Sequence, residues 1–133
     1  MQKPLIVGLQ GRVVGLDIHT GEVMWHNELQ GSGSASVALA VNDDWVYASA
    51  SAARVFCLNR QTGETVWSEK TTGLGRATIL IDSEEEKVFV AKSGHIDCFS
   101  MAYGEREWNK DLSKLGKKSV ALGLSDNVVQ ADQ

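Results

Sequence analysis

The sequence is poor in several features that would point to a particular class of protein. Its 133 residues include one proline and two cysteines, and the cysteines do not form a Cys-x-x-Cys pair, so neither a disulfide framework nor a zinc site is indicated. No apolar run approaches the roughly 18 residues that a membrane span needs. The net charge of -4 argues against a broad electrostatic surface for nucleic acid. We therefore expect no nucleic-acid partner and no membrane partner.

The first residues do not resemble a leader. The apolar stretch Leu5-Ile6-Val7 is soon interrupted by Gly8 and Arg12, so we predict no signal peptide. A cytoplasmic location follows, with a periplasmic location as the alternative if the chain is a fragment of an exported protein. Hydrophobic residues make up 43% of the chain, which is enough for a packed core.

An eleven-residue frame occurs three times, with a glycine at its seventh position, a glutamate at its eighth and a tryptophan at its eleventh. The copies span residues 15–25, 57–67 and 98–108, so the tryptophans are 42 and 41 residues apart. A period of about 40 residues fits either four short strands or a pair of helices. The repeat must therefore be assigned from its residue types.

Those residue types favour strands. Val13-Val14, Val55-Phe56 and Val88-Phe89-Val90 are β-branched or aromatic residues in short runs. The Thr-Gly pairs of the first two frames form turns readily, because glycine accepts a positive φ angle. No segment shows the sustained apolar stripe of a helix. Four strands per repeat predict the blades of a β-propeller.

We therefore predict an all-β fold, in which one segment of a β-propeller with four-stranded blades occupies residues 1–133. The repeats are expected at about 5–35, 36–75 and 76–118, with a partial repeat at 119–133. Lettering the strands of a blade A to D in chain order, we expect a first blade without strand A, two complete blades and a final A–B pair. About three blades per chain do not close a propeller, so we expect oligomerisation to complete it.

The repeated frame resembles the tryptophan-docking motif Ala-x-Asp-x-x-Thr-Gly-x-x-x-Trp of quinoprotein-type (PQQ-like) β-propellers. The first copy matches it at Asp17, Thr20, Gly21 and Trp25, whereas the third keeps only its glycine and tryptophan. The resemblance implies one of two functions. The family includes dehydrogenases that use pyrroloquinoline quinone with calcium, and it includes scaffolds such as the propeller lipoprotein of outer-membrane assembly.

The spacing of the frame also predicts a structural role. Each tryptophan must pack over a small residue at the first position of its own frame. The Asp or Asn at the third position can accept hydrogen bonds from turn amides. The resemblance implies that the tryptophans lock each blade to its neighbour. The expected docking residues are Trp25, Trp67, Trp108, Gly21, Gly63, Gly104, Gly15, Cys57, Cys98, Asp17 and Asn59.

Residues for catalysis are not evident. We find no Ser-His-Asp set, no metal-ligand cluster and no isolated pair of acids, so we predict no catalytic, cofactor-binding or metal-binding residues and no cofactor. The acidic stretch 82–86 lacks the ligand spacing of a calcium loop and is better interpreted as a hairpin turn. The adjacent cysteines that the resemblance associates with the quinone cofactor are missing, since Cys57 and Cys98 lie in different repeats.

Charges are expected to separate between the two rims of the propeller. Most acids fall in A–B and C–D turns, and most bases fall in B–C and D–A connections. This polarity is compatible with simple solubility or with an anionic ligand or partner on the basic rim. The residues of that possible face are Arg54, Arg76, Lys114, Lys117 and Lys118.

We therefore hypothesise a non-catalytic scaffold or binding module that displays its inter-blade loops to a protein or ligand. The alternative is part of a quinone-dependent dehydrogenase, or of another propeller enzyme, assembled from several chains. Unpaired strand edges invite pairing, so strand A at 119–124 of one chain could complete the first blade of another. Two chains would then close a six-bladed homodimer, in which the strand expected at 127–131 competes with Leu5–Leu9 for one position.

Overall fold

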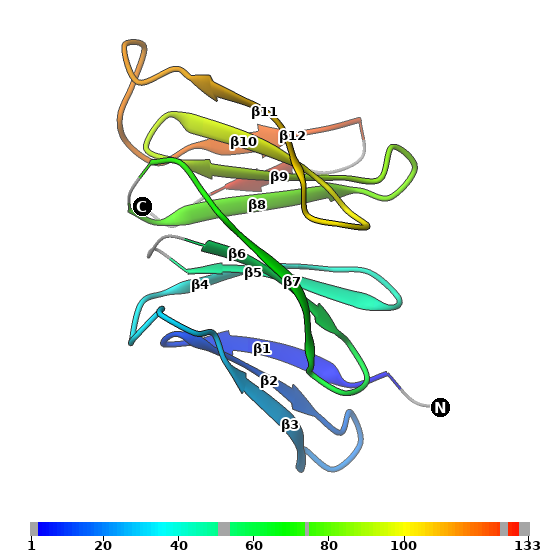
Figure 1. Ribbon diagram of the computed structural model, residues 1–133. Helices are drawn as coiled ribbons and strands as arrows, with labels where there is room; N and C mark the ends of the chain where they lie inside the picture. Colours follow the sequence, from blue (N-terminus) through cyan, green and yellow to red (C-terminus); the bar gives the residue numbers. More distant parts are fainter. Residues whose placement is uncertain (1–2, 51–53, 74, 126–127, 131–133) are drawn as a thin grey trace.

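Antiparallel β-sheets stacked face to face make up the fold (Figure 1). The computed structural model describes residues 3–50, 54–73, 75–125 and 128–130. Blade 1 is a three-stranded sheet, blades 2 and 3 are four-stranded sheets, and a terminal strand pair follows. Blade 1 contains β1 (Leu5–Leu9), β2 (Arg12–Leu16) and β3 (Val23–Glu28); blade 2 contains β4 (Val37–Val41), β5 (Trp45–Ala50), β6 (Arg54–Asn59) and β7 (Thr65–Lys70); blade 3 contains β8 (Ala77–Asp82), β9 (Lys87–Lys92), β10 (His95–Ser100) and β11 (Arg106–Asp111); the terminal strand pair is β12 (Ala121–Gly123) and β13 (Val128–Gln130).

The predicted fold class is confirmed: the chain is an all-β segment of a propeller, with strands that follow chain order across each blade. Some strands are shorter than expected. We expected the second strand to continue to Ile18, but β2 ends at Leu16, where the backbone enters the turn of the first frame. The expected strand at 119–124 is reduced to β12. Residues 127 and 131, the ends of the last expected strand, lie outside the described residues. None of the described residues forms a helix that could cross a membrane.

The three frames adopt the same local structure. In each blade, the first residue of the frame pairs directly with its tryptophan, and the ladder register shifts immediately afterwards, between Gly15 and Leu16, Cys57 and Leu58, and Cys98 and Phe99. Such β-bulges bend and twist a strand. The frame glycines have φ angles of 76°, 77° and 73°, which glycine adopts without the steric cost of a Cβ. The sequence repeat is therefore also a repeat of backbone conformation.

Two hydrophobic cores lie between the blades rather than within one sheet. The first joins blade 1 to blade 2 and the second joins blade 2 to blade 3. Alternate residues of a blade-2 strand serve different cores, because successive side chains of a strand point to opposite faces. On β6, Phe56 and Leu58 enter the first core, while Val55 and Cys57 enter the second. Stacking the blades therefore buries the apolar residues on both faces of blade 2.

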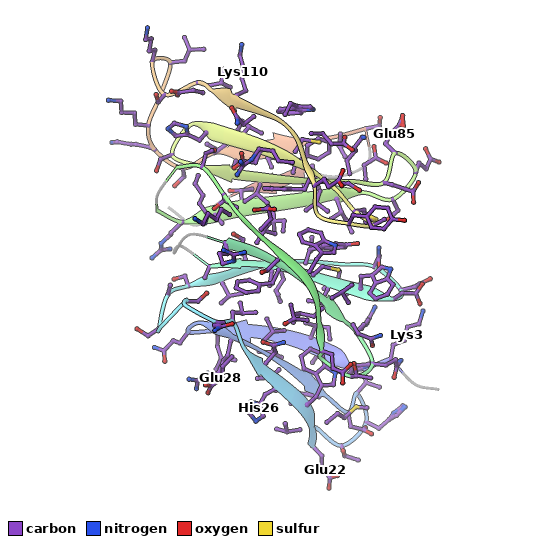
Figure 2. The ribbon with its side chains drawn as sticks, viewed as in Figure 1. Lys3, Glu22, His26, Glu28, Glu85 and Lys110 are labelled. Carbon is purple, nitrogen blue, oxygen red and sulfur yellow. The ribbon has the colours of Figure 1, made fainter. Side chains whose placement is uncertain are left out.

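The connections fall on two opposite rims, as Figure 1 shows. The A–B turns at 42–44 and 83–86 and the C–D turns of the frames lie on the right in that view. The described residues of the D–A connections, 29–36, 71–73, 75–76 and 112–120, lie on the left. Glu85, which is labelled in Figure 2, projects from the right-hand rim.

Candidate functional site

The indole of Trp25 docks on the C–D turn of the next blade. Its Nε1 donates a 3.0 Å hydrogen bond to the backbone carbonyl of Arg60. The ring lies so close to Gly63 that a Cβ there would be 2.3 Å from Trp25 Cε3, and a Cβ at Gly15 would be 2.5 Å from Trp25 Cε2. Asn27 adds a 2.7 Å hydrogen bond from its Nδ2 to the carbonyl of Gly63. Trp25 is 8% exposed, so the contact is nearly dry.

Trp67 repeats this contact one blade later. Its Nε1 donates a 3.0 Å hydrogen bond to the carbonyl of Met101. A Cβ at Gly104 would be 2.4 Å from Trp67 Cδ2. The ring also lies 6.1 Å from that of Tyr47 and 6.5 Å from that of Phe99, centroid to centroid. Both inter-blade junctions are therefore built around a tryptophan that covers a glycine of the next frame.

Side chains at the third position of the frame hold the accepting turn in shape. Asp17 Oδ1 accepts hydrogen bonds from the amides of His19, at 2.8 Å, and Thr20, at 3.0 Å. These two bonds lower the pKa of the Asp17 carboxyl. Asn59 Oδ1 accepts the equivalent bonds from Gln61, at 2.9 Å, and Thr62, at 3.0 Å. The turn that can receive a tryptophan is thus held in shape by its own hydrogen bonds, whether or not a tryptophan covers it.

Two of the predicted docking residues have no partner frame within the described chain. Trp108 pairs with Cys98 in its own blade and is 46% exposed, although its ring lies 6.2 Å from that of Phe89. A Cβ at Gly21 would have no heavy atom within 4 Å. Within the described residues, Trp25 and Trp67 dock on the next frame, whereas Trp108 has no following frame and the turn at Gly21 is uncovered.

The two cysteines occupy the small position opposite their tryptophans and are free and buried. Burial raises the pKa of the Cys57 thiol to about 12 and also raises that of Cys98. Cys57 pairs across the ladder with both Tyr47 and Trp67. These neighbours leave it protonated and enclosed.

The residues of the predicted basic face are in different surroundings. Lys114, Lys117 and Lys118 are exposed on the D–A connection at 112–120. Arg54 is half-buried at the start of β6, where its Nε and Nη2 donate to Ser68 Oγ at 3.3 and 3.2 Å. Arg76 is exposed just before β8. The three lysines therefore form one local group, and Arg54 is partly engaged within its own blade.

An apolar pocket of about 560 Å³ lies beside those lysines. Ile96 and Leu112 line it together with Leu115, which is strongly exposed. Lys117 and Lys118 contribute to its wall. The charges are visible in the sequence but the pocket is not, because the pocket forms only where the connection folds back against β10.

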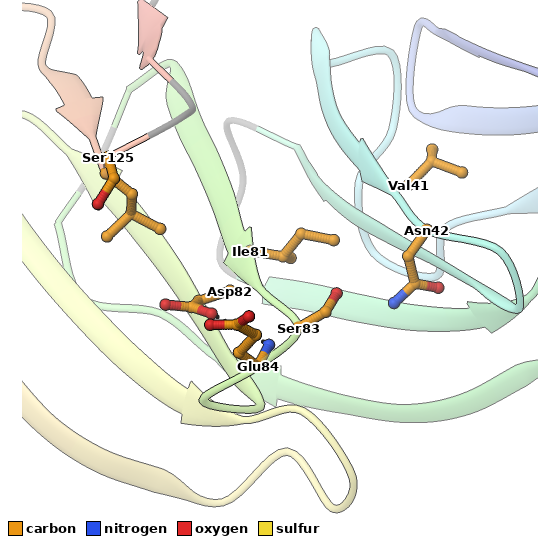
Figure 3. A pocket seen from close by; sticks show the side chains of 8 residues that line it. Val41, Asn42, Ile81, Asp82, Ser83, Glu84 and Ser125 are labelled. Carbon is orange, nitrogen blue, oxygen red and sulfur yellow. Dashed lines mark hydrogen bonds between the residues drawn. The ribbon is translucent and has the colours of Figure 1, made fainter.

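A second pocket, of about 430 Å³, lies on the acidic rim between blades 2 and 3 and the terminal strand pair. Figure 3 shows Asn42 on one side of it and Asp82, Ser83 and Glu84 on another. Asp82 Oδ1 accepts hydrogen bonds from the amides of Glu84 and Glu85, each at 3.1 Å. The carboxylate thus caps its own hairpin turn. Among the described residues, no three His, Cys, Asp or Glu side chains gather where they could hold a metal ion.

A buried ionic cluster that the sequence did not lead us to predict lies between blades 2 and 3. Lys92 is 1% exposed and donates a 2.9 Å hydrogen bond from Nζ to Thr71 Oγ1. Asp97 is fully buried and accepts bonds from Thr72 N and Oγ1 at 2.7 and 2.9 Å. Arg106 Nε lies 3.1 Å from Asp97 Oδ1. The cluster fixes the D–A connection of blade 2 to blade 3.

A signal for this cluster was present in the sequence. Lys92 follows Val88 and Val90 at a spacing of two, and Asp97 precedes Phe99 by two. In a strand these residues share one face. Because Val88, Val90 and Phe99 are buried against blade 2, Lys92 and Asp97 are directed there as well.

Comparisons with known proteins agree with this geometry. A family model described as outer membrane protein assembly factor BamB matches residues 9–132. The structure of BamB from Moraxella catarrhalis is similar to the chain with a TM-score of 0.69 and 17% identity, over 97% of this chain and 44% of that one. No curated protein matches the sequence.

Two other propeller structures are similar to the chain. Quinohemoprotein alcohol dehydrogenase from Comamonas testosteroni gives a TM-score of 0.69 and 13% identity, over 96% of this chain and 30% of that one. The computationally designed Ika4 protein gives 0.70 and 17%, over 98% and 79%. The chain thus spans less than half of the BamB structure and less than a third of the dehydrogenase. At these identities, the comparisons show a shared fold.

Proposed function

Because the chain belongs to the family of the outer membrane protein assembly factor BamB, we propose that it is a non-catalytic propeller scaffold that binds a partner protein through its inter-blade loops. The family description concerns outer-membrane assembly, which supports a periplasmic location of the protein rather than the cytoplasmic one expected from its first residues.

The observation that carries this proposal is the apolar pocket beside the lysines of the 112–120 connection. Its lining is mainly apolar, with Ile96, Leu112 and Leu115 near the positive charges of Lys117 and Lys118. Concave apolar surface provides affinity, and the charges at its edge select and steer an oppositely charged partner. The partner that fits is a protein segment carrying both apolar and acidic side chains.

A binding assay tests the proposal with a fluorescent peptide of alternating leucine and aspartate as probe. Replacing Lys114, Lys117 and Lys118 with glutamine should weaken binding roughly tenfold and flatten its salt dependence. The matched control replaces Glu84, Glu85 and Glu86 with glutamine on the opposite rim, and it should leave binding unchanged. Equal binding by wild type and the lysine variant would refute the proposed binding face.

Self-association is part of the same proposal. The designed Ika4 protein, of whose chain this one covers 79%, shares the fold. We propose that two copies close a six-bladed homodimer. The exposed apolar side chains of blade 1, among them Leu5 and Leu9, favour burial by a second copy.

The likeness to a quinohemoprotein alcohol dehydrogenase supports one alternative, a propeller enzyme assembled from several chains. The described residues do not fit a calcium-quinone site, because they provide no cluster of ligands and their two cysteines are buried in different blades. Calorimetry with pyrroloquinoline quinone and calcium tests this alternative. Stoichiometric binding of either would favour the enzyme over the scaffold.

A further inference from the structure

We propose that Trp108 of one copy docks on the turn formed by residues 17–21 of a second copy, and that this contact closes the assembly. This inference rests on the self-association proposed above and identifies its interface. It extends to two chains a contact that the structure shows twice within one chain.

The accepting turn of blade 1 already has the conformation of the two occupied turns. Gly21 has a φ angle of 76°, against 77° at Gly63 and 73° at Gly104. The amide of Gly21 donates to the carbonyl of Asp17 at 2.9 Å, and the equivalent bonds at Gly63 and Gly104 are 2.8 Å. The carbonyl of Ile18 occupies the frame position of the two carbonyls that accept bonds from Trp25 and Trp67. The turn therefore offers a preformed acceptor above an open glycine.

Trp108, the residue that would dock, has the same place in its blade as the tryptophans that do dock. Trp108 lies opposite Cys98 as Trp25 lies opposite Gly15, and the ladder has its bulge at the same place. Trp108 is nevertheless half-exposed, whereas Trp25 is buried by its contact with the next frame. A half-exposed indole next to the ring of Phe89 is an apolar surface that association would remove from water.

The residues around the accepting turn of blade 1 occupy the same ladder positions as residues that are buried in blade 2. Leu5 pairs with Leu16 in blade 1 as Val46 pairs with Leu58 in blade 2. Val46 and Leu58 are fully buried against the preceding blade, whereas Leu5 is 52% and Ile18 61% exposed. Blade 1 thus presents, uncovered, the face that blade 2 buries.

Charge complementarity supports a second copy as the occupant. Lys110 is two residues beyond Trp108, where blade 1 has Asn27, whose Nδ2 bonds to Gly63 O. In the docked pair, Lys110 would reach the carbonyl of Gly21 and the carboxylate of Glu22. Figure 2 shows Lys110 and Glu22 at opposite ends of the stack, so the two half-sites cannot meet within one chain. Two copies related by a rotation can pair both.

This arrangement places β1 of the second copy beside β12, where β13 lies in the structure. The strand β13 is displaced, because only one second strand fits in a blade. The exchange replaces the three-residue strand β13 by the five-residue strand β1, which stays paired with β2 of its own chain.

Sedimentation velocity over a concentration series tests the inference with Trp108→Ala and Gly21→Asn. Asparagine tolerates the left-handed conformation of Gly21, and its Cβ would have no heavy atom within 4 Å in the single chain, but that Cβ would clash with a docked indole. Each variant should raise the dimer dissociation constant at least roughly tenfold. Val66→Ala, which truncates an equally exposed side chain away from the interface, should not change it.

Mixing the two variants provides the sharper test. A mixed dimer retains one intact pair, Trp108 of the Gly21→Asn chain on Gly21 of the Trp108→Ala chain. Heterodimer formation above the level of either variant alone is expected. Wild-type dimers that neither variant weakens would overturn this interface but leave self-association standing. A folded wild-type monomer at about 100 µM would overturn self-association as well, while peptide binding at the lysine loop would still be testable on that monomer.

Discussion

Trp25 Nε1 and the carbonyl oxygen of Arg60 are 3.0 Å apart, although their residues are separated by 35 positions in the chain. This one bond joins the last strand of blade 1 to the C–D turn of blade 2. Trp67 and Met101 form the same bond at the next junction, across 34 positions. The blades are therefore attached to one another by a contact that every frame can both provide and receive.

The first prediction compares two tryptophans of the same frame position. Trp67→Ala should lower the free energy of unfolding by about 3–5 kcal/mol, because it removes a docked aromatic ring and a hydrogen bond. Trp108→Ala should cost clearly less, since its indole is half-exposed and has no docking partner in the chain. Urea denaturation of monomeric protein measures both. Similar losses in the two variants would contradict the docking interpretation.

The second prediction concerns the frame glycines. Alanine at Gly21, Gly63 or Gly104 suffers the same backbone strain, about 1–2 kcal/mol, because all three have closely similar positive φ angles. Only at Gly63 and Gly104 does the new Cβ meet an indole. We expect these two variants to lose roughly 1–3 kcal/mol more than Gly21→Ala. Thermal unfolding gives the difference directly, and equal losses would mean that the indole moves aside at little cost.

The repeated frame made much of this architecture predictable. Three glycines and three tryptophans in register indicated the period, and residue types indicated four strands per repeat. Whether a frame is occupied is not visible within the frame itself. Docking requires a following blade with its own C–D turn, and neither Gly21 nor Trp108 differs locally from the residues that dock.

The third prediction concerns pH. Burial lowers the pKa of Lys92 from 10.5 to about 8, an effect that the Asp97 carboxylate only partly offsets. Between these values the unfolded chain binds more protons than the folded chain, so stability should rise with pH across that interval. The gain attributable to Lys92 is about 3 kcal/mol in order of magnitude.

Lys92→Met is the matched variant, because it keeps the length of the side chain and cannot titrate. Urea denaturation at pH 7.5 and pH 10 should show wild type gaining stability relative to this variant at the higher pH. Parallel pH profiles for the two proteins would show that folding leaves the pKa of Lys92 near its unfolded value, which would contradict the prediction.

The fourth prediction concerns the cysteines. Cys57 and Cys98 are buried, and burial raises the pKa of both thiols, so neither provides a thiolate for reaction. A disulfide reagent should label neither in the native protein at pH 8 and both after unfolding in urea. Stoichiometric labelling of the native protein within seconds would show that the junction at Cys57 or the outer face of blade 3 opens readily.

The basic rim shows the limit of charge patterns in the sequence. Assigning lysines and arginines to connections placed them on one rim, but their individual surroundings depend on how each connection folds. Arg54 turns to Ser68 of its own blade, and the lysines of 112–120 stand next to a pocket. An apolar cavity between a connection and a strand has no periodic signature, so it could not be foreseen.

The ionic cluster around Lys92 has a consequence for the order of the blades. Where blade 3 presents Asp97 and Arg106, blade 2 presents Phe56 and Thr65 at the same ladder positions. A chain with blades 2 and 3 exchanged would bury a lysine and an aspartate against a blade that lacks the receiving threonines at 71 and 72. Repeats of nearly identical shape are thus made non-interchangeable by charge, which discourages the chain from stacking its blades in the wrong sequence during folding.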